Sequence, residues 1–346
     1  MTAAATRVGS VQHRDTDVTV IGAGVAGLTT ALCLAESGLS VAVHAAEPPL
    51  QTTSVAAGAI FGPHMVGNDE RIAGWAAVTM NKLSEMAGDA GQSANGAAPQ
   101  SFVHLATGIA ATRTAGAAPP DFAADAPSLS ACDPARVPPG YKSAWRLTAP
   151  LVSMPEYLEY LYQRYLRSGG QPVVLASYPT LADAASSAAS PVLVNCPGAS
   201  ASQFVPDPEV VPVRGQAVLV ANPGISEFFV GIGPDDGDLT YMFPHGERLV
   251  LGGTEQPGNW SREPDEPTAA RIIAACAAIH PKIAAAPVLA HRVGLRPFRP
   301  AVRLEAEQLP AGPWVVHNYG HGGSGVTLSW GCARDAAGLA RAALAR

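Results

Sequence analysis

Residues 17–47, DVTVIGAGVAGLTTALCLAESGLSVAVHAAE, decide the fold of this chain. The stretch opens with a short, β-branched apolar run at 18–21, which is typical of a buried parallel strand. A glycine pattern of the form G-x-G-x-x-G follows at once, and apolar residues then recur at helical spacing over 25–36. Gly38 stands where a left-handed residue ends a helix, and 40–43 has the composition of a second strand. The stretch therefore predicts a strand, a helix and a parallel strand in one unit.

The three glycines of this pattern have distinct expected roles in binding a dinucleotide. Gly22 makes the tight turn, Gly24 lets the backbone approach a pyrophosphate, and Gly27 lets the helix and strand pack closely. The N-terminus of the helix then faces the anion. This pattern usually has a carboxylate near the end of the second strand, where it binds the ribose. Alanines occupy that position here, at 45–46, so Glu47 is the nearby substitute.

Length, charge and hydropathy limit the classes of protein to consider. The chain has 346 residues, enough for two lobes with a large core, and a formal net charge of −6. That charge argues against nucleic-acid binding, which needs a basic surface. The sequence contains no run of about 18 apolar residues, so no membrane-spanning helix is predicted. The polar residues 1–16 lack the apolar stretch of a signal peptide and are interpreted as a flexible tail.

Five cysteines are scattered singly along the chain, and none belongs to a C-x-x-C or C-x4-C pair. This spacing excludes a zinc ribbon and the redox-active disulfide of the flavin disulfide reductases. We therefore expect core thiols in a reducing cytoplasm, with Cys33 on the first helix and Cys196 directly after an apolar strand.

Beyond residue 47 the chain contains both helical and strand-like segments. Apolar runs predict strands at 145–151, 173–176, 192–194 and 314–316, of which 173–176 and 192–194 are short and buried. Two further strands, at 210–221 and 248–252, are predicted to be antiparallel and to belong to a second sheet. Amphipathic spacing predicts helices at 70–86, 155–168, 267–279 and 326–344. Residues 88–139 are rich in alanine, glycine, serine and proline, which predicts long loops.

Residues 320–325, GHGGSG, form a second glycine-rich helix start. Such an end offers free N–H groups and a positive partial charge of roughly half a unit. A reduced flavin is an anion around its N1–C2 carbonyl edge, so this end suits an isoalloxazine ring. An ordinary strand-to-helix turn explains the spacing equally well, and both interpretations stay open on spacing alone.

Several motifs occur in order between 20 and 333: VIGAGVAGL, VAAG, VNCPG, RGQ, LGGT, GLRPFRP and HNYGHGGSGVTLSWGCA. Together they resemble the D-amino-acid oxidase and D-aspartate oxidase family of flavoproteins, with GLRP-x-RP and HNYGHGG-x-G as the most specific. The resemblance implies non-covalent FAD and an α/β fold. In that fold a Rossmann-like FAD-binding domain (17–70, 145–200 and 290–346) interleaves with a substrate-binding domain (71–144 and 201–289) built on a mostly antiparallel mixed β-sheet.

The same resemblance implies roles for individual residues in substrate binding. Arg296 of GLRP would hold the substrate α-carboxylate in a bidentate pair, which suits a planar, permanently charged fork. Tyr241 would donate its hydroxyl to the same carboxylate, and the carbonyl of Gly323 would accept from the amino group. A structural salt bridge for Arg296 and an ordinary strand-end aromatic for Tyr241 are the alternatives. Arg299 is expected to have a structural role.

The remaining residues implied by the resemblance surround the cofactor and the substrate. The residues expected to line FAD are Gly22, Gly24, Val25, Ala26, Gly27, Glu47, Thr53, Ser54, Ala57, Gly58, Val174, Arg296, Gly322, Gly323, Gly325, Val326 and Thr327. Those expected to line the substrate pocket are the apolar Ala59, Ile60, Phe61 and Phe243. The two histidines of HNYGHGG are expected to be structural or to flank the flavin.

The resemblance implies oxidative deamination of neutral D-amino acids, with the α-hydrogen passing as a hydride to flavin N5 and with no general base. The expected partners are a D-amino acid and O2, and a homodimer is an option that the sequence leaves open. Three alternatives remain: a D-aspartate oxidase, an FAD-dependent dehydrogenase with another acceptor, and an FAD-binding scaffold without turnover.

The loop before Tyr241 departs from the family pattern. Gly237 replaces a second tyrosine of mammalian members, which predicts a reduced lid over the pocket. The loop also holds Asp235, Asp236 and Asp238 and lacks an arginine, which disfavours acidic substrates.

Overall fold

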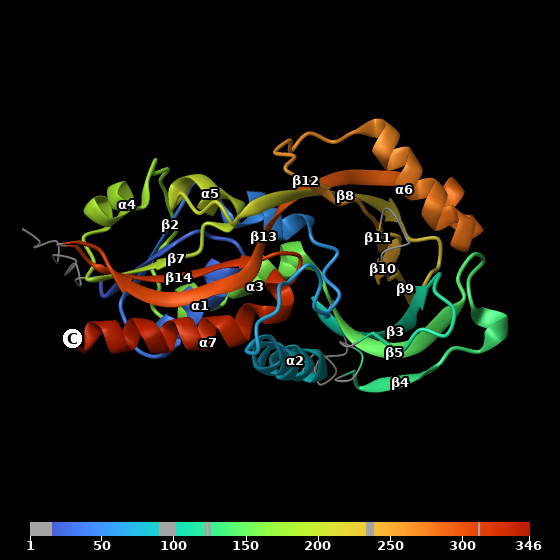
Figure 1. Cartoon of the computed structure of the whole chain (residues 1–346), viewed down its shortest axis with the longest axis horizontal. Helices are drawn as coiled ribbons and strands as arrows, with labels where there is room; N and C mark the ends of the chain where they lie inside the picture. The colour runs from blue at the N-terminus through green and yellow to red at the C-terminus, as the bar shows by residue number, and fades with distance from the viewer. Residues whose placement is uncertain (1–15, 90–101, 121–122, 124–125, 233–238, 311) are drawn as a thin grey trace, which may run out of the picture.

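A single sheet runs through the whole molecule (Figure 1). The computed structural model describes residues 16–89, 102–120, 123, 126–232, 239–310 and 312–346. In these residues the sheet has 14 strands, with the order β4-β5-β3-β9-β10-β11-β8-β13-β14-β7-β1-β2-β6 and β12 paired with β8. The strands from β14 to β6 are parallel, and those on the other side of β13 are mostly antiparallel. The predicted α/β fold with parallel strands and a mixed, mostly antiparallel part is therefore confirmed, but the two parts form one continuous sheet and not two.

The parallel half is built on the predicted strand–helix–strand unit. Its strands are β1 (Val18–Ile21), β2 (Val41–Ala45), β6 (Val174–Leu175), β7 (Val192–Asn195) and β14 (Trp314–His321). Val18 pairs with both Val41 and Val192, so β1 lies between β2 and β7. Helix α1 (Val25–Glu36) has the predicted bounds, and Gly38 beyond its end has a φ of 89°. The positive φ explains why glycine stands there.

Helices cover both faces of this half (Figure 1). Helices α1, α3 (Met154–Arg167) and α7 (Gly325–Leu344) share one apolar core, in which Leu28, Tyr157 and Leu328 are fully buried. The short helices α4 (Leu181–Ala188) and α5 (Ala201–Phe204) lie on the opposite face. Burial of these apolar side chains drives the packing of the helices against the sheet.

The antiparallel half extends to the right in Figure 1. Its strands are β3 (Val103–Thr112), β4 (Ser128–Ala131), β5 (Ser143–Val152), β8 (Val211–Ala221), β9 (Phe228–Gly231), β10 (Tyr241–His245), β11 (Arg248–Gly252), β12 (Gln256–Pro257) and β13 (Val288–Gln308). Helix α6 (Glu266–Ile279) packs on β8 and β11. Strand β13 pairs with β8 along its first part and with β14 along its second part, so in the described residues the sheet continues from one half into the other.

Two expectations from the sequence need correction. Residues 88–139, predicted to be long loops, contain the ten-residue strand β3 and the edge strand β4. The small residues of β3 hide its pattern but are needed for packing, since a Cβ on Gly108 would lie 2.3 Å from Phe228 Cγ. Strand β6 is an exposed edge strand, with Leu175 63% exposed, and not the buried strand predicted.

The domain boundaries remain a proposal, which the packing of two elements refines. Strand β5 lies between β4 and β3, although the predicted boundary at 145 assigned it to the cofactor half. Helix α2 (Ile72–Asp89) packs against α7, where Gly331 allows it to approach: a Cβ there would be 2.3 Å from Trp75 Cα. We therefore propose that β5 belongs with the substrate half and α2 with the cofactor half. In the described part of the chain, no helix is long and apolar enough to cross a membrane.

Candidate active site

A cavity of about 850 Å³ lies where the parallel half meets the antiparallel half. This volume is at the upper end of the roughly 300–1,000 Å³ range of small-molecule and cofactor pockets. Nearly every residue that the sequence analysis assigned to cofactor or substrate lines it. These residues are Gly22, Gly24, Val25, Ala26, Gly27, Glu47, Thr53, Ser54, Ala57, Gly58, Ala59, Ile60, Phe61, Tyr241, Phe243, Arg296, Gly322, Gly323, Gly325, Val326 and Thr327.

The glycine-rich turn after β1 forms one end of the cavity. Gly22 has a φ of 109°, and a Cβ there would lie 2.3 Å from the carbonyl oxygen of Cys196. A Cβ on Gly27 would lie 1.9 Å from the carbonyl oxygen of Gly22, so the helix and the turn touch. Around Gly24, by contrast, the nearest atom to a Cβ is Ser54 Oγ at 3.1 Å. Gly22 and Gly27 therefore shape the backbone, whereas Gly24 keeps space open beside the N-terminus of α1.

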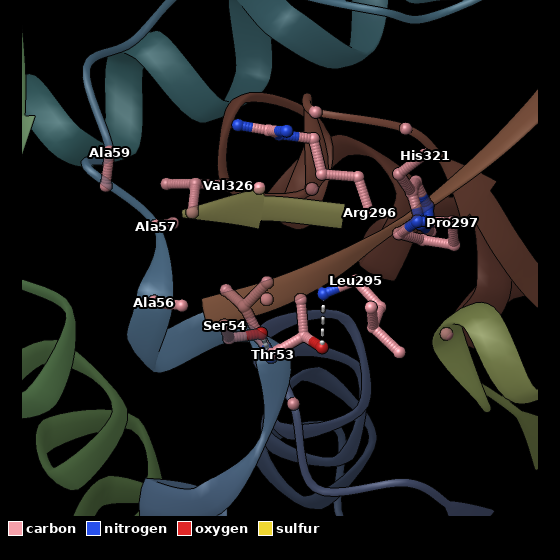
Figure 2. A pocket seen from close by; sticks show the side chains of 18 of the residues that line it. Thr53, Ser54, Ala56, Ala57, Ala59, Leu295, Arg296, Pro297, His321 and Val326 are labelled. Atoms are coloured by element: carbon pink, nitrogen blue, oxygen red, sulfur yellow. Dashed lines mark hydrogen bonds between the residues drawn. The ribbon is translucent and has the colours of Figure 1, made fainter. Parts of the chain in front are cut away.

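Ser54 and Thr53 connect this turn to the far side of the cavity. They belong to the short 3-10 helix η2 (Thr53–Ala56). The hydroxyl of Ser54 accepts a hydrogen bond from the N–H of Val25 at 2.9 Å, at the start of α1. The hydroxyl of Thr53 accepts from the N–H of Leu295 at 3.3 Å, the dashed line in Figure 2. These bonds fix η2 between α1 and β13.

Glu47 lies at the same end and is bound by an arginine from the other half of the molecule. Arg262 forms an ion pair with Glu47 and donates a second bond to the carbonyl of Gln51 at 2.7 Å. Arg262 follows β12 in a polar loop, and no motif in the sequence indicated it. Both side chains line the cavity, so this pair joins the two halves at the position expected for the ribose.

The start of α7 forms a further wall of the cavity and is bonded to residues 62–65. Thr327 Oγ1 both accepts from the N–H of Gly62 and donates to its carbonyl, each at 3.1 Å. Ser324 Oγ accepts from the N–H of His64 at 2.7 Å and donates to its carbonyl at 2.9 Å. Gly322 has a φ of 54°, and a Cβ there would lie 1.7 Å from Met65 O. The first turn of α7 is thus held close to the chain that follows Gly58.

Arg296 lies on β13 with its side chain on the opposite side of the strand from Leu295 (Figure 2). Its Nη1 donates to the carbonyl of Thr254 at 2.8 Å. Among the described residues, no carboxylate lies within ion-pair distance of its guanidinium, so the alternative of a structural salt bridge is not observed. Space for the guanidinium exists because residue 215 is glycine: a Cβ there would lie 2.5 Å from Nη1. The cavity therefore has a guanidinium with unused donors.

Tyr241 lies on β10 and is almost entirely buried. Its ring stacks on that of Phe243, with centroids 4.5 Å apart and planes at 8°. Gly252 makes room for it, because a Cβ there would lie 2.3 Å from the Tyr241 hydroxyl oxygen. Burial raises the pKa of Tyr241, although nearby Arg296 opposes the shift. The phenol therefore stays protonated at neutral pH and is available as a donor.

Two residues that the sequence analysis did not single out also line the cavity near Arg296. Nε2 of His64 lies 2.6 Å from Oε1 of Glu255. Glu255 directly follows the motif LGGT. His64 follows the motif VAAG after the five residues AIFGP. A polar side chain next to a motif was the available signal, but the pairing of two residues 191 positions apart was not visible in the sequence.

Some expected residues lie elsewhere. Val174 is 45% exposed on the edge strand β6 and is not among the residues that line the cavity, so its contact with FAD stays a prediction. Arg299 binds Asp207 at 3.1 Å and pairs with Glu209, consistent with its expected structural role. His317 bonds to Glu307 at 2.9 Å. The aspartates and Gly237 of the loop before Tyr241 fall at 233–238, outside the described residues.

The residues present fit a bound FAD. Gly24 leaves a cradle beside the N-terminus of α1, and the wall formed by Gly322, Gly323 and Gly325 keeps the backbone accessible at the start of α7. Two helix N-termini thus face one cavity, each with free N–H groups and a positive partial charge. A ligand with a pyrophosphate and a ring that becomes anionic on reduction matches this arrangement.

Comparisons with known proteins agree with this fit. The family model of the FAD dependent oxidoreductases matches residues 17–339. The chain is 44% identical to the D-amino-acid oxidase of Rubrobacter xylanophilus (94% of this chain, 96% of that protein) and 43% identical to that of Streptomyces coelicolor (95% and 98%). It is 32% identical to human D-aspartate oxidase (93% and 94%).

Solved structures show the same fold at low identity. Glycine oxidase from Geobacillus kaustophilus superposes with a TM-score of 0.76 at 19% identity, covering 94% of each chain. L-α-glycerophosphate oxidase from Mycoplasma pneumoniae, solved with FAD bound, gives a TM-score of 0.71 at 14% identity, again covering 94% of each chain. The matches over nearly the whole length, together with the two glycine-rich helix starts around one cavity, lead to one conclusion: the chain belongs to the FAD dependent oxidoreductase family and has FAD as its cofactor.

Proposed function

We propose that the protein oxidises neutral D-amino acids: with O2 and water, the D-amino acid yields a 2-oxo acid, ammonia and hydrogen peroxide. The observation that carries this proposal is the guanidinium of Arg296, which faces the cavity with unused donors and no carboxylate partner among the described residues. A planar guanidinium binds a carboxylate through two parallel hydrogen bonds. Identity to the two bacterial D-amino-acid oxidases, 44% and 43%, exceeds the 32% to D-aspartate oxidase and supports this substrate class.

The roles of the chain's own residues follow from their placement. Arg296 holds the substrate carboxylate, and Tyr241 donates its hydroxyl to the same group. The carbonyl of Gly323, in the wall at the start of α7, accepts from the amino group. Three fixed points then orient the α-carbon, and orientation of this kind supplies much of the rate acceleration in a positioned reaction. When bound, FAD supplies the acceptor for the hydride of the α-carbon.

The two histidines of HNYGHGG, His317 and His321, are not placed to act as general bases. His321 lines the cavity, but burial lowers its pKa to about 4, and its Nε2 donates to Asn318 Oδ1 at 3.0 Å. His317 is fully buried, with both ring nitrogens bonded, to Glu307 and to Asn195. These contacts support structural roles for both rings and agree with a reaction in which the α-hydrogen leaves as a hydride.

A panel of D-amino acids in a peroxide assay tests the proposal. Catalytic efficiency, kcat/KM, is expected to be higher for D-alanine, D-valine and D-methionine than for D-aspartate and D-glutamate. Among the described lining residues the arginines are Arg296, which takes the α-carboxylate, and Arg262, which is paired with Glu47. A second carboxylate would therefore lack its own cation, which costs several kcal/mol in a buried site. A higher kcat/KM for D-aspartate would refute this prediction and support a D-aspartate oxidase.

The electron acceptor and the compartment are further parts of this proposal. Turnover with O2, and release of peroxide in proportion to 2-oxo acid, distinguishes an oxidase from a dehydrogenase that uses another acceptor. All five cysteines lie among the described residues and are free thiols, which supports a reducing compartment such as the cytoplasm. Bleaching of the bound flavin by a D-amino acid without O2 would exclude an inactive FAD-binding scaffold.

Replacing Gly215 with alanine is expected to weaken substrate binding without removing any group that binds it. The new Cβ would lie 2.5 Å from Nη1 and 2.7 Å from Cζ of Arg296, so the guanidinium has to move. We expect the KM for D-alanine to rise by about tenfold, since a charge-assisted hydrogen bond is worth about 1.5–3 kcal/mol. Flavin content should not change. An unaltered KM would show that Arg296 does not need the space above residue 215.

A further inference from the structure

The hydrogen-bonded pair of His64 and Glu255 lies in the cavity but has no part in the proposed chemistry. His64 belongs to the chain segment that follows Gly58, and Glu255 lies between β11 and β12. Nε2 of His64 donates to Oε1 of Glu255 at 2.6 Å, and both side chains line the cavity. We ask what this pair contributes to the choice of substrate.

The pair lies next to two groups that are proposed to hold the substrate. Arg296 donates to the carbonyl of Thr254, the residue directly before Glu255, at 2.8 Å. His64 packs closely against Gly323: a Cβ placed on Gly323 would lie 2.6 Å from Cδ2 of His64. A substrate held by Arg296 and by the carbonyl of Gly323 would therefore have the carboxylate of Glu255 nearby.

Glu255 gives this part of the cavity a negative charge. The hydrogen bond from His64 is the main cause that holds the pKa of Glu255 below its usual value; burial opposes the shift, and Arg296 adds to it. The carboxylate is therefore ionised at neutral pH. Among the described lining residues the other carboxylate is Glu47, which pairs with Arg262. A cation that enters beside Arg296 thus finds Glu255 as its counter-charge.

The present partner of Glu255 is easily replaced. The side chains of His64 and Glu255 are 38% and 30% exposed, so water reaches both. Solvent-exposed contacts to a carboxylate contribute little to stability, so a permanent cation can take the place of the imidazole at low cost. A primary ammonium or a guanidinium is such a cation, since both stay charged at neutral pH.

We propose that Glu255 is the subsite for the cationic side chain of a basic D-amino acid, such as D-lysine or D-arginine, which displaces His64 on binding. The inference rests on the proposed function and extends its substrate range from neutral to basic side chains. The same carboxylate repels a second acidic group and so disfavours D-aspartate and D-glutamate.

The experiment compares D-lysine with D-norleucine, which has the same four-carbon side chain without the ammonium. In Glu255→Gln the ratio of kcat/KM for D-lysine to that for D-norleucine is expected to fall by about tenfold or more, as one charge-assisted bond is lost. Glu85→Gln is the matched control, because Glu85 is 61% exposed on α2 in an ion pair with Lys82, outside the cavity. It should leave the ratio unchanged.

A second variant moves the ratio in the opposite direction. His64→Ala removes the group that competes for Glu255, so the ratio for D-lysine over D-norleucine should rise. A purely structural role of the pair would change both substrates alike in both variants. Flavin content, measured by absorbance, shows that each variant still binds the cofactor.

The outcomes separate this inference from the function on which it rests. A wild-type enzyme that oxidises D-norleucine, but whose ratio is the same in Glu255→Gln, overturns the subsite and leaves the proposed function standing. A wild-type enzyme that oxidises neither amino acid overturns the proposed function, and the inference with it. Opposite shifts of the ratio in the two variants support the subsite.

Discussion

Replacing Arg296 with leucine is expected to abolish useful substrate oxidation while the bound flavin keeps its spectrum. The guanidinium faces the cavity, with one donor on the carbonyl of Thr254 and no carboxylate partner among the described residues. Without it, the substrate carboxylate enters the cavity unpaired. Loss of one partner of a hydrogen-bonded charge pair costs roughly 2–5 kcal/mol, which lowers kcat/KM about 30-fold to about 5,000-fold. Steady-state kinetics with D-alanine or D-methionine measure this change.

Two milder variants show whether the loss comes from the carboxylate contact. Arg296→Lys should recover only part of the activity, because an ammonium cannot form two parallel bonds with a carboxylate. Tyr241→Phe should cost less than Arg296→Leu, about 1.5–3 kcal/mol for a single hydrogen bond to a charged group. If Tyr241→Phe were as inactive as Arg296→Leu, Tyr241 would have a role beyond donating this bond.

Replacing Gly24 with valine is expected to remove the cofactor before it damages the fold. The nearest atoms to a Cβ at this position are Ser54 Oγ at 3.1 Å and Thr52 Oγ1 at 3.8 Å, so the Ser54 side chain has to shift only slightly to admit the Cβ. The added atoms would instead fill the space beside the N-terminus of α1 that a pyrophosphate needs. Loss of one charge-assisted hydrogen bond weakens binding about 10- to 150-fold. The dissociation constant of FAD, measured by flavin fluorescence, tests this directly.

Two other glycines serve as controls for this variant. Gly27→Val is expected to destabilise the protein itself, since its Cβ would lie 1.9 Å from the carbonyl oxygen of Gly22. A Cβ on Gly74 of α2 would meet no atom within 4 Å, so Gly74→Val should change neither FAD affinity nor the fold. Equal FAD affinity of Gly24→Val and the wild type would show that the cofactor does not approach this turn.

The local pattern of the sequence was enough to predict the first strand–helix–strand unit of the cofactor half. Strand β1, helix α1 and strand β2 follow from an apolar run, a helical period and glycines that all lie within about thirty residues. Such signals depend on neighbours along the chain, so the bounds of α1 could be predicted correctly. Strand β3 could not be predicted in this way. Its Gly108 packs against Phe228 of β9, which follows more than a hundred residues later in the chain. Composition alone indicated a loop there.

The sequence by itself determined which residue types the site contains: the glycines of two helix starts, the arginine of GLRP and the tyrosine of β10. Only the tertiary structure decided how they fit together. Gly215 leaves room for Arg296 and Glu255 meets His64, in both cases between segments that are distant in the chain, and Gly252 leaves room for Tyr241 across the β10–β11 hairpin. The physical reason is that close packing and ion pairing depend on distance in space. The pattern along a chain predicts such distances only within one helix, one strand or one turn.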